Sequence, residues 1–257
     1  WELRNTPRMF LNSKQALLKA YRRIFKDLRP RLRGHYGETT PGALEVAEMP
    51  VHLAFSKPDA WYQPLDNSPG RFLVNTLYYE ARPIWRMESL ALRYGPPGSH
   101  TLFSAAASAE LPAFRKYNGI PAFDEGWAWY VGTLGVQFGL FQDPHARYGH
   151  LVEEMIATVR LAVDTGIHSL GWSRQEALEF IARYTPLPAH RMSGEIDYIA
   201  TNPGAAGAGK AGQRKFLELR DATAQEQGAG FNSCRFHERL LEDGPITFDL
   251  LEAKLAE

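Results

Sequence analysis

The sequence predicts a mainly α-helical protein with a small antiparallel β element near its N-terminal third. Apolar residues recur at helical spacing before Pro30 and over most of the chain after Pro83. Residues 44–76 differ, because they contain short β-prone runs separated by Pro and Gly. Such a pattern is typical of a small sheet or a set of hairpins.

One domain is expected for the whole chain, residues 1–257. Of these 257 residues 44% are hydrophobic, which is enough to bury a core. The patterning divides the domain into a helix and connector (1–43), the β element (44–76) and a helical core (77–257).

The first predicted helix starts at a capping box formed by Asn12 and Gln15 and ends at Pro30, because the residue before a proline avoids the helical conformation. The β segments that follow are 44–46, 51–55 and 71–75. Further along, Ser173 and Glu176 form a second capping box. A low-complexity stretch at 204–212 precedes a helix at about 213–225, and a short helix at about 247–256 closes the chain.

Charge and cysteine content exclude several classes of protein. Lys plus Arg and Asp plus Glu both number 29, so nothing indicates a nucleic-acid partner. No apolar run reaches the roughly 20 residues of a membrane span. The single cysteine, Cys234, excludes an internal disulfide, and a cytoplasmic or a periplasmic location is compatible with the composition. Because the chain begins at Trp1, a leader or a further domain upstream is compatible with it.

Glu125 is a carboxylate within the apolar, aromatic start of a helix at 123–130. A buried carboxylate needs a cation, a metal ion or hydrogen-bond donors, or else it takes up a proton. The alternative is an ordinary carboxylate at a helix start, stabilised by free backbone N–H groups.

Arg160, Asp164 and His168 follow one another at steps of four and form a polar ridge beside an apolar helix face. Such a ridge can orient the imidazole toward a substrate or a metal ion. The alternative is an ion pair capped by a histidine on a solvated face, and Gly166 weakens the continuity of the helix. Lys210 does not make a phosphate-binding loop, because Ala211 follows it where Ser or Thr is needed.

The order of short motifs resembles the bacterial family known as domain of unknown function 885, a group of zinc-peptidase-like proteins. The matching segments are 75–92, 125–128, 160–168 with 171–172, 203–204, 210 with 212, 219–220 and 236–237. The resemblance covers nearly all of the chain and corresponds to the C-terminal half of a typical member. It implies a helical metallopeptidase-like fold with a small sheet beside the site, and an N-terminal half that this sequence does not contain.

The family's signature, His-Glu-x-x-Pro-Gly-His-His, is altered here. Arg93, Tyr94 and Ser99 stand where the resemblance implies His, Glu and His, while His100 is kept and Gly209 replaces a Tyr. A zinc site needs about three neutral or anionic ligands, whereas an arginine is permanently charged. A phenol with a pKa near ~10 cannot replace the Glu as general base.

Three interpretations follow for the site. In the first, the scaffold has lost its metal ion and its hydrolytic activity, Arg93 forms a bidentate pair with Glu125, and no cofactor is bound. A peptide or small amide would still bind near Arg160, Asp164 and His168.

In the second interpretation, the protein is an active metal-dependent hydrolase, with zinc held by His100, Glu125 and His168 and with Asp164 behind them. In the third, the chain is a structural or interaction domain and has no ligand-sized polar cleft between the Glu125 helix and the 160–168 helix.

Overall fold

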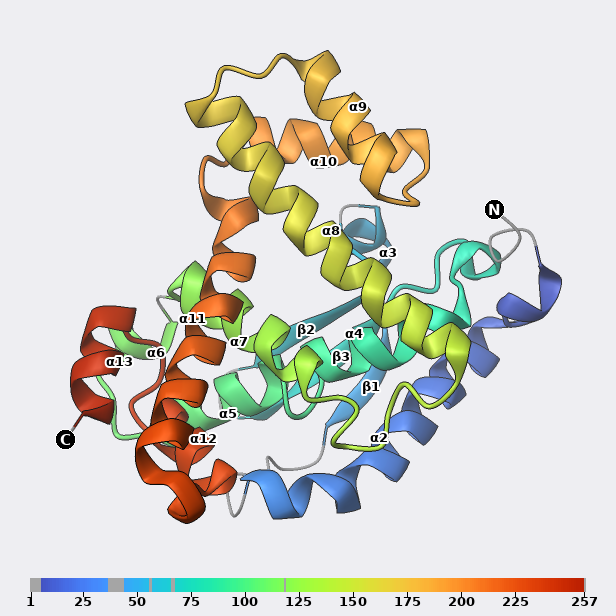
Figure 1. Cartoon of the computed structure of the whole chain (residues 1–257). Coiled ribbons are helices and arrows are strands. Elements are labelled where there is room, and N and C mark those ends of the chain that lie inside the picture. Colours follow the sequence, from blue (N-terminus) through green and yellow to red (C-terminus); the bar gives the residue numbers. More distant parts are fainter. Residues whose placement is uncertain (1–5, 37–43, 56, 66–67, 118, 257) are drawn as a thin grey trace.

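The computed structural model describes residues 6–36, 44–55, 57–65, 68–117 and 119–256. The described chain is mainly helical, as predicted, with a three-stranded sheet near its N-terminal third (Figure 1). The helices are α2 (Lys14–Tyr36), α3 (Val51–Ala54), α4 (Met87–Tyr94), α5 (Ser99–Ser108), α6 (Ala113–Tyr117), α7 (Pro121–Thr133), α8 (Pro144–Ser169), α9 (Arg174–Tyr184), α10 (Ala189–Thr201), α11 (Ala205–Gln227), α12 (Ser233–Leu241) and α13 (Phe248–Leu255).

Helix α2 continues through Pro30 to Tyr36, so the prediction that Pro30 ends it is wrong. Leu28, Leu32 and Tyr36 are buried in the main hydrophobic core. Burial of a large apolar side chain contributes about 1.5–3 kcal/mol, so these three side chains offset the roughly 3 kcal/mol that a proline costs inside a helix.

The sheet is mixed rather than wholly antiparallel. Strands β2 (Ala60–Leu65) and β3 (Ser68–Val74) form an antiparallel hairpin, although 60–65 was not among the predicted β segments, whereas β1 (Glu45–Glu48) pairs with β3 in parallel. The sheet order is therefore β1-β3-β2. The chain reverses between β1 and β2, and β3 then reverses again and lies between them, so that β3 runs parallel to β1.

The segment 51–55 does not form the predicted strand, because Val51–Ala54 is the short helix α3. Asn75, at the end of β3, donates its side-chain amide to the Ala54 carbonyl at 2.7 Å and so satisfies an acceptor at the end of this helix. The β propensity of this segment is overridden by a contact from 21 residues further along the chain.

The two predicted capping boxes have different outcomes. Ser173 and Glu176 form both hydrogen bonds of the box at the start of α9. At α2, the helix starts at Lys14, one residue later than a cap at Asn12 would place it. The Ser13 hydroxyl accepts the Ala16 N–H at 3.1 Å. Neighbouring polar residues compete for a cap, so sequence alone places a helix start only to within a residue or two.

The glycine-rich stretch 204–212 is part of a helix, since α11 starts at Ala205 and not near Gln213 as predicted. Gly212 and Gly126 bring the backbones of α11 and α7 into contact, because a Cβ built on Gly212 would lie 1.8 Å from the Ala122 carbonyl oxygen. The glycines therefore serve close helix packing rather than a loop.

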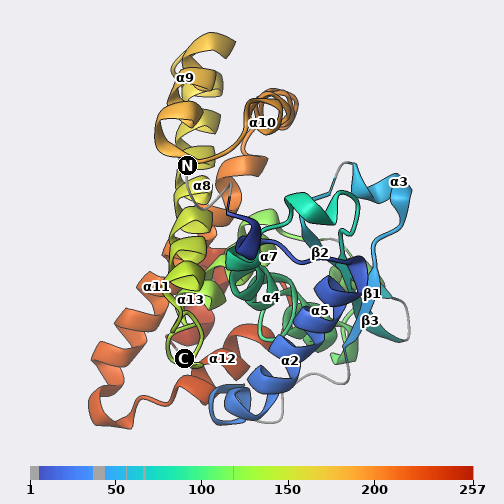
Figure 2. The ribbon, with the colours of Figure 1, turned by 90° about the vertical axis from the view of Figure 1, so that its right-hand side faces the viewer.

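Helix α8 is continuous through Gly166 to Ser169, so the expected weakening at this glycine is not seen. The Trp172 ring packs directly against Gly166, where a Cβ would lie 2.3 Å from the indole. Helices α9 and α10 pack on this end of α8, at the top of Figure 1. In Figure 2 the sheet lies at the right and α8 and α11 lie at the left, with α4 and α7 between them. No helix in the described part of the chain has both the length and the hydropathy to cross a membrane.

Candidate functional site

Arg93, the penultimate residue of α4, occupies the centre of the candidate site. Its side chain is buried, and the guanidinium carbon lies 3.3 Å from the centre of the Trp129 ring on α7. One terminal nitrogen lies 3.4 Å from Glu153 of α8, and the other lies 3.8 Å from Glu125 of α7. Two carboxylates and an aromatic face thus surround one fixed positive charge.

The Arg93–Glu125 ion pair is present, but the bidentate geometry expected for it is not. A bidentate pair has two parallel bonds of about 2.7–2.9 Å, which is shorter than the 3.8 Å found here. Glu125 is also not the buried carboxylate that the sequence predicted, because 42% of its side chain is exposed. Glu153, which is buried, takes the second guanidinium nitrogen instead.

Sequence reasoning did not find Glu153 as a site residue. Its Oε1 accepts a 2.7 Å hydrogen bond from Nε of Arg86, at the end of the 3₁₀ turn η4 (Ile84–Arg86), while its Oε2 lies toward Arg93. The available signal was its spacing, since Glu153 precedes the buried Ala157 by one turn of α8. A glutamate on the inner face of a helix requires cationic partners.

The ion pairs continue to Asp59, just before β2. Arg82 and Arg86 each donate to one of its two carboxylate oxygens. Burial alone would raise the pKa of Asp59, but the neighbouring guanidinium groups of Arg86, Arg82 and Arg191 hold this pKa below its usual range. Asp59 therefore stays ionised inside the protein.

Tyr94 cannot supply a base. Its side chain is buried, with its ring 5.6 Å from that of Trp61. Burial raises the pKa of the phenol, and the nearby Arg93 only partly offsets this effect. The hydroxyl is therefore protonated at neutral pH.

Ser99 and His100 begin α5 and hold the turn that follows α4. The Ser99 hydroxyl donates to the Arg93 carbonyl at 3.1 Å. The His100 imidazole is fully buried, with Nδ1 3.3 Å from the Tyr62 hydroxyl of β2. Both side chains thus have protein partners.

Gly209 of α11 lies next to Trp129 and Glu125 of α7. A Cβ built on Gly209 would lie 2.8 Å from Cδ1 of Trp129 and 3.1 Å from the Glu125 Cβ. A tyrosine here, as the family resemblance implies, would have to displace Trp129. Gly209 and Arg93 are therefore linked through the Trp129 indole, which lies next to both.

The ridge of Arg160, Asp164 and His168 joins α8 to the corner between α10 and α11. Arg160 donates two hydrogen bonds, of 2.6 and 2.7 Å, to Glu195 of α10. Burial alone would lower the pKa of Arg160, but the Glu195 carboxylate raises it overall. Arg160 thus pairs with Glu195 of α10, and not with Asp164 one turn along α8 as the alternative interpretation of the ridge would require.

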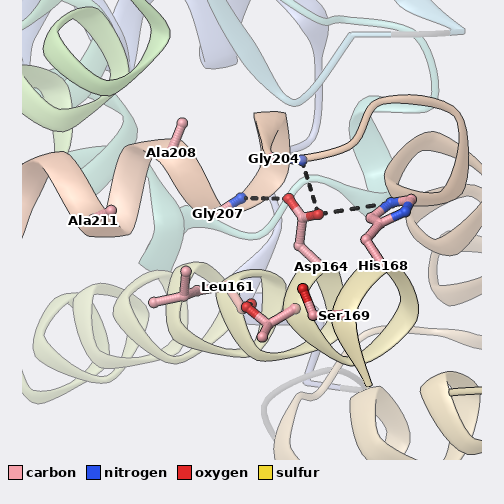
Figure 3. A pocket seen from close by; sticks show the side chains of 9 residues that line it. Leu161, Asp164, His168, Ser169, Gly204, Gly207, Ala208 and Ala211 are labelled. Carbon is pink, nitrogen blue, oxygen red and sulfur yellow. Dashed lines mark hydrogen bonds and ion pairs between the residues drawn. The ribbon is translucent and has the colours of Figure 1, made fainter. Parts of the chain in front are cut away.

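Asp164 and His168 also bond to the corner between α10 and α11. The Asp164 carboxylate accepts the backbone N–H groups of Gly204 and Gly207, both at 3.0 Å, where α11 starts (Figure 3). His168 Nε2 lies 3.0 Å from the Ile199 carbonyl oxygen and 3.7 Å from Asp164 Oδ1. These contacts position two helices, and they use the polar atoms that were predicted to bind a substrate.

A hollow of about 300 Å³ lies between α8 and the start of α11 (Figure 3). Its walls include two of the predicted binding residues, Asp164 and His168, but not Arg160. The remaining lining residues are Leu161, Thr165, Ser169, Gly204, Gly207, Ala208 and Ala211. None of them comes from α7, so the hollow is not a cleft between α7 and α8.

The predicted ligand set for zinc does not assemble. Within the described ranges, no three His, Cys, Asp or Glu side chains gather in a group that could hold a metal ion. His100, Glu125 and His168 therefore do not form the three-ligand site of the second interpretation. The residues around Arg93 do not fit a divalent cation either, because the guanidinium already occupies the space between the two glutamates.

The fold and the site define a mainly helical protein with a buried, ion-paired arginine at the end of α4. The chain belongs to the family described as "Bacterial protein of unknown function (DUF885)", whose model matches residues 2–255. This confirms the family membership that the sequence motifs indicated, while the zinc-peptidase-like character and the altered signature stay predictions. The family description names no activity. Among curated proteins, none matches this chain.

Two solved structures are similar to the chain. A protein from Colwellia psychrerythraea, designated a candidate lipoprotein, superposes with a TM-score of 0.93 at 27% identity over 99% of this chain. A candidate lipoprotein of unknown function from Shewanella oneidensis gives 0.84 at 15% identity over 99% of the chain, which shows the fold alone. The chain spans 45% and 48% of those two proteins, less than half of each.

Proposed function

We propose that this protein is a metallopeptidase-like scaffold that no longer hydrolyses its ligand but still binds a peptide or small amide. The observation that carries the proposal is the position of the Arg93 guanidinium, over Trp129 and between Glu153 and Glu125. It stands where the family resemblance implies a metal-binding histidine.

The charges around Arg93 favour loss of metal chemistry. A divalent cation next to a guanidinium would meet strong repulsion in a site that water screens poorly. The glutamates already neutralise Arg93, and the neighbouring phenol of Tyr94 remains protonated. No group at this site is therefore assigned to a hydrolytic step.

The ligand-binding face that we propose adjoins the buried arginine. It is formed by partly exposed charged side chains from three helices, Glu125 of α7, Arg160 of α8 and Arg191 of α10. Charged groups of both signs suit the amide and terminal groups of a peptide. The hollow beside Asp164 suits a ligand less well, because Asp164 and His168 already bond to the protein.

Three measurements on the purified protein test this proposal. Elemental analysis after dialysis should find well below one zinc per chain, and a broad peptide library should not be cleaved. The same library should yield peptides that bind in a calorimetric assay. Zinc near one equivalent that is lost in His168→Ala would overturn the proposal in favour of the active hydrolase.

A structural or interaction domain is the second candidate function. It is favoured by one observation, that Arg160, Asp164 and His168 are all engaged in contacts between helices. Absence of any binding from a broad set of peptides and small amides at millimolar concentration would support this candidate over the first.

A further inference from the structure

Asp59 is the buried centre of a group of arginines. Its Oδ1 accepts a hydrogen bond from Arg82 and its Oδ2 accepts one from Arg86. Each carboxylate oxygen of Asp59 thus already accepts a hydrogen bond, and a third arginine, Arg191, lies nearby.

Arg191 reaches this group from the first turn of α10. Its Nη1 lies 4.0 Å from Asp59 Oδ1, which is beyond hydrogen-bond distance, and 31% of its side chain is exposed. Glu195, one turn further along α10, is the other nearby carboxylate, and Arg160 occupies both of its oxygens. Arg191 thus lies between two carboxylates whose oxygens are already bonded to other arginines.

Among the described residues of this group, the arginines outnumber the carboxylates by one. Around the site, five arginines meet four carboxylates, and the two sets are joined by the ion pairs described above. The arginines are 82, 86, 93, 160 and 191, and the carboxylates are Asp59, Glu125, Glu153 and Glu195.

The environment of Arg191 accordingly disfavours its charge. Burial lowers the pKa of Arg191, and Asp59 and Glu195 do not restore it because Arg86 and Arg82 are also close. An additional anion at this position would relieve the imbalance.

We propose that Arg191 binds a carboxylate group of the ligand, so that the peptide or small amide is held by an anionic end. This inference rests on the proposed function and names the chemistry that its ligand must carry. A guanidinium pairs with a carboxylate through two parallel hydrogen bonds. Its partial exposure admits the ligand, while the surrounding protein limits screening by water.

The first experiment uses acetate alone. Side-chain Nε–Hε signals of arginines are followed by NMR while sodium acetate is added, against sodium chloride at equal ionic strength. We expect a saturable acetate-specific shift in the wild type and in Arg174→Gln, and none in Arg191→Gln. Arg174 is the matched control, since it pairs with Asp197 on the exposed side of α10.

Arg191→Gln should fold, because it removes a charge that its surroundings do not compensate, and circular dichroism checks this. An equal acetate shift in Arg191→Gln would overturn the inference. The same titration with inorganic phosphate distinguishes the anion: saturation by phosphate at much lower concentration than by acetate would overturn the assignment to a carboxylate.

The second experiment compares library peptides that carry a free or an amidated C-terminus. The free form should bind the wild type and Arg174→Gln about tenfold more tightly, which is 1.4 kcal/mol, and this ratio should fall to about one in Arg191→Gln. Equal binding of both forms would overturn the inference and leave the proposed function standing. Acetate binding at Arg191 without any peptide binding would overturn the proposed function and leave only a carboxylate-binding site at Arg191.

Discussion

The Arg93 guanidinium carbon lies 3.3 Å from the centre of the Trp129 ring, and the same indole lies against the backbone of α11 at Gly209. A cation over an indole ring contributes about 0.5–2 kcal/mol, more when water is excluded. Arg93 is thereby held in a fixed place, although its nearest hydrogen-bond acceptor lies 3.4 Å away. The site depends on the absence of a side chain at Gly209 as much as on the charges.

Gly209→Ala should therefore destabilise the protein. The new Cβ would lie 2.8 Å from the buried Trp129, so the indole must move away from Arg93. We expect a loss of about 1–3 kcal/mol in urea denaturation. Gly194→Ala in α10 is the control, because nothing lies near its Cβ position and alanine should gain about 0.5–1 kcal/mol there. A gain of stability at both positions would contradict this account.

Glu153→Gln should be more damaging than most charge removals. The substitution leaves Arg86 and Arg93 buried with less compensating charge. A loss of about 3 kcal/mol is expected from chemical denaturation. Glu218→Gln, at an exposed ion pair within α11, should change stability by less than about 0.5 kcal/mol. Equal effects of the two substitutions would mean that the buried ion pairs contribute little.

Asp164→Ala tests whether this carboxylate acts on the fold. It would leave the N–H groups of Gly204 and Gly207 without their acceptor, at a cost of about 1–3 kcal/mol. Hydrogen exchange should accelerate at residues 204–211 in the absence of any ligand. Asp197→Ala, which breaks an exposed pair with Arg174, is the control. Unchanged hydrogen-exchange protection at residues 204–211 would show that Asp164 does not stabilise the start of α11, and would favour its predicted role in binding.

Asp124, in the first turn of α7, should make stability fall as pH rises. Burial, assisted by Glu125, raises the pKa of Asp124 to about 7, whereas an unfolded aspartate has a pKa of about 3.9. The folded state binds this proton more tightly, so the stabilisation is full below about pH 4 and is lost as the pH rises to about 7.

Asp124→Asn should accordingly raise stability at pH 8 by about 1–3 kcal/mol and change it little at pH 4. The measurement is urea denaturation at both pH values. Asp249→Asn, in the exposed first turn of α13, should instead lose a few tenths of a kcal/mol. Destabilisation of Asp124→Asn at pH 8 would show that this carboxylate is ionised and well solvated.

His237 has the opposite dependence on pH. Burial lowers its pKa to about 4. Nε2 lies 2.8 Å from the Tyr130 hydroxyl and Nδ1 lies 3.1 Å from the His35 carbonyl oxygen, an arrangement that suits a neutral ring. Because an unfolded histidine has a pKa of about 6.5, stability from this group is lost as the pH falls from about 6.5 to about 4. NMR titration of the imidazole should find a pKa below 5, and a value near 6.5 would contradict the buried neutral form.

Local patterns predicted much of the fold. The helical periodicity, the Ser173 capping box and the β propensity of the segments that form β1 and β3 all depend on residues close in sequence, whereas β2 was not predicted. The errors have a common cause in distant contacts. Burial of α2 outweighs Pro30, and Trp172 packs on Gly166.

The site was less accessible to sequence reasoning. The family signature indicated Arg93 as a site residue, and the apolar neighbours of Glu125 indicated that carboxylate. No local signal indicated that Glu153 and Trp129 would be the nearest partners, since they come from different helices. Likewise, the partners of Asp164 lie 40 and 43 residues further along the chain. Spacing predicted a polar ridge of Arg160, Asp164 and His168 on one side of the helix, but spacing cannot reveal which element that ridge faces.

Helix α8 has 26 residues, which gives a rod about 39 Å long. Near the middle of α8, Glu153 forms ion pairs with Arg86 and Arg93. Near the end of α8, Asp164 and His168 bond to the α10–α11 corner. A rod without a hinge transmits displacement along its length. A displacement of the α10–α11 corner would therefore be carried along α8 to Glu153 and the arginines paired with it.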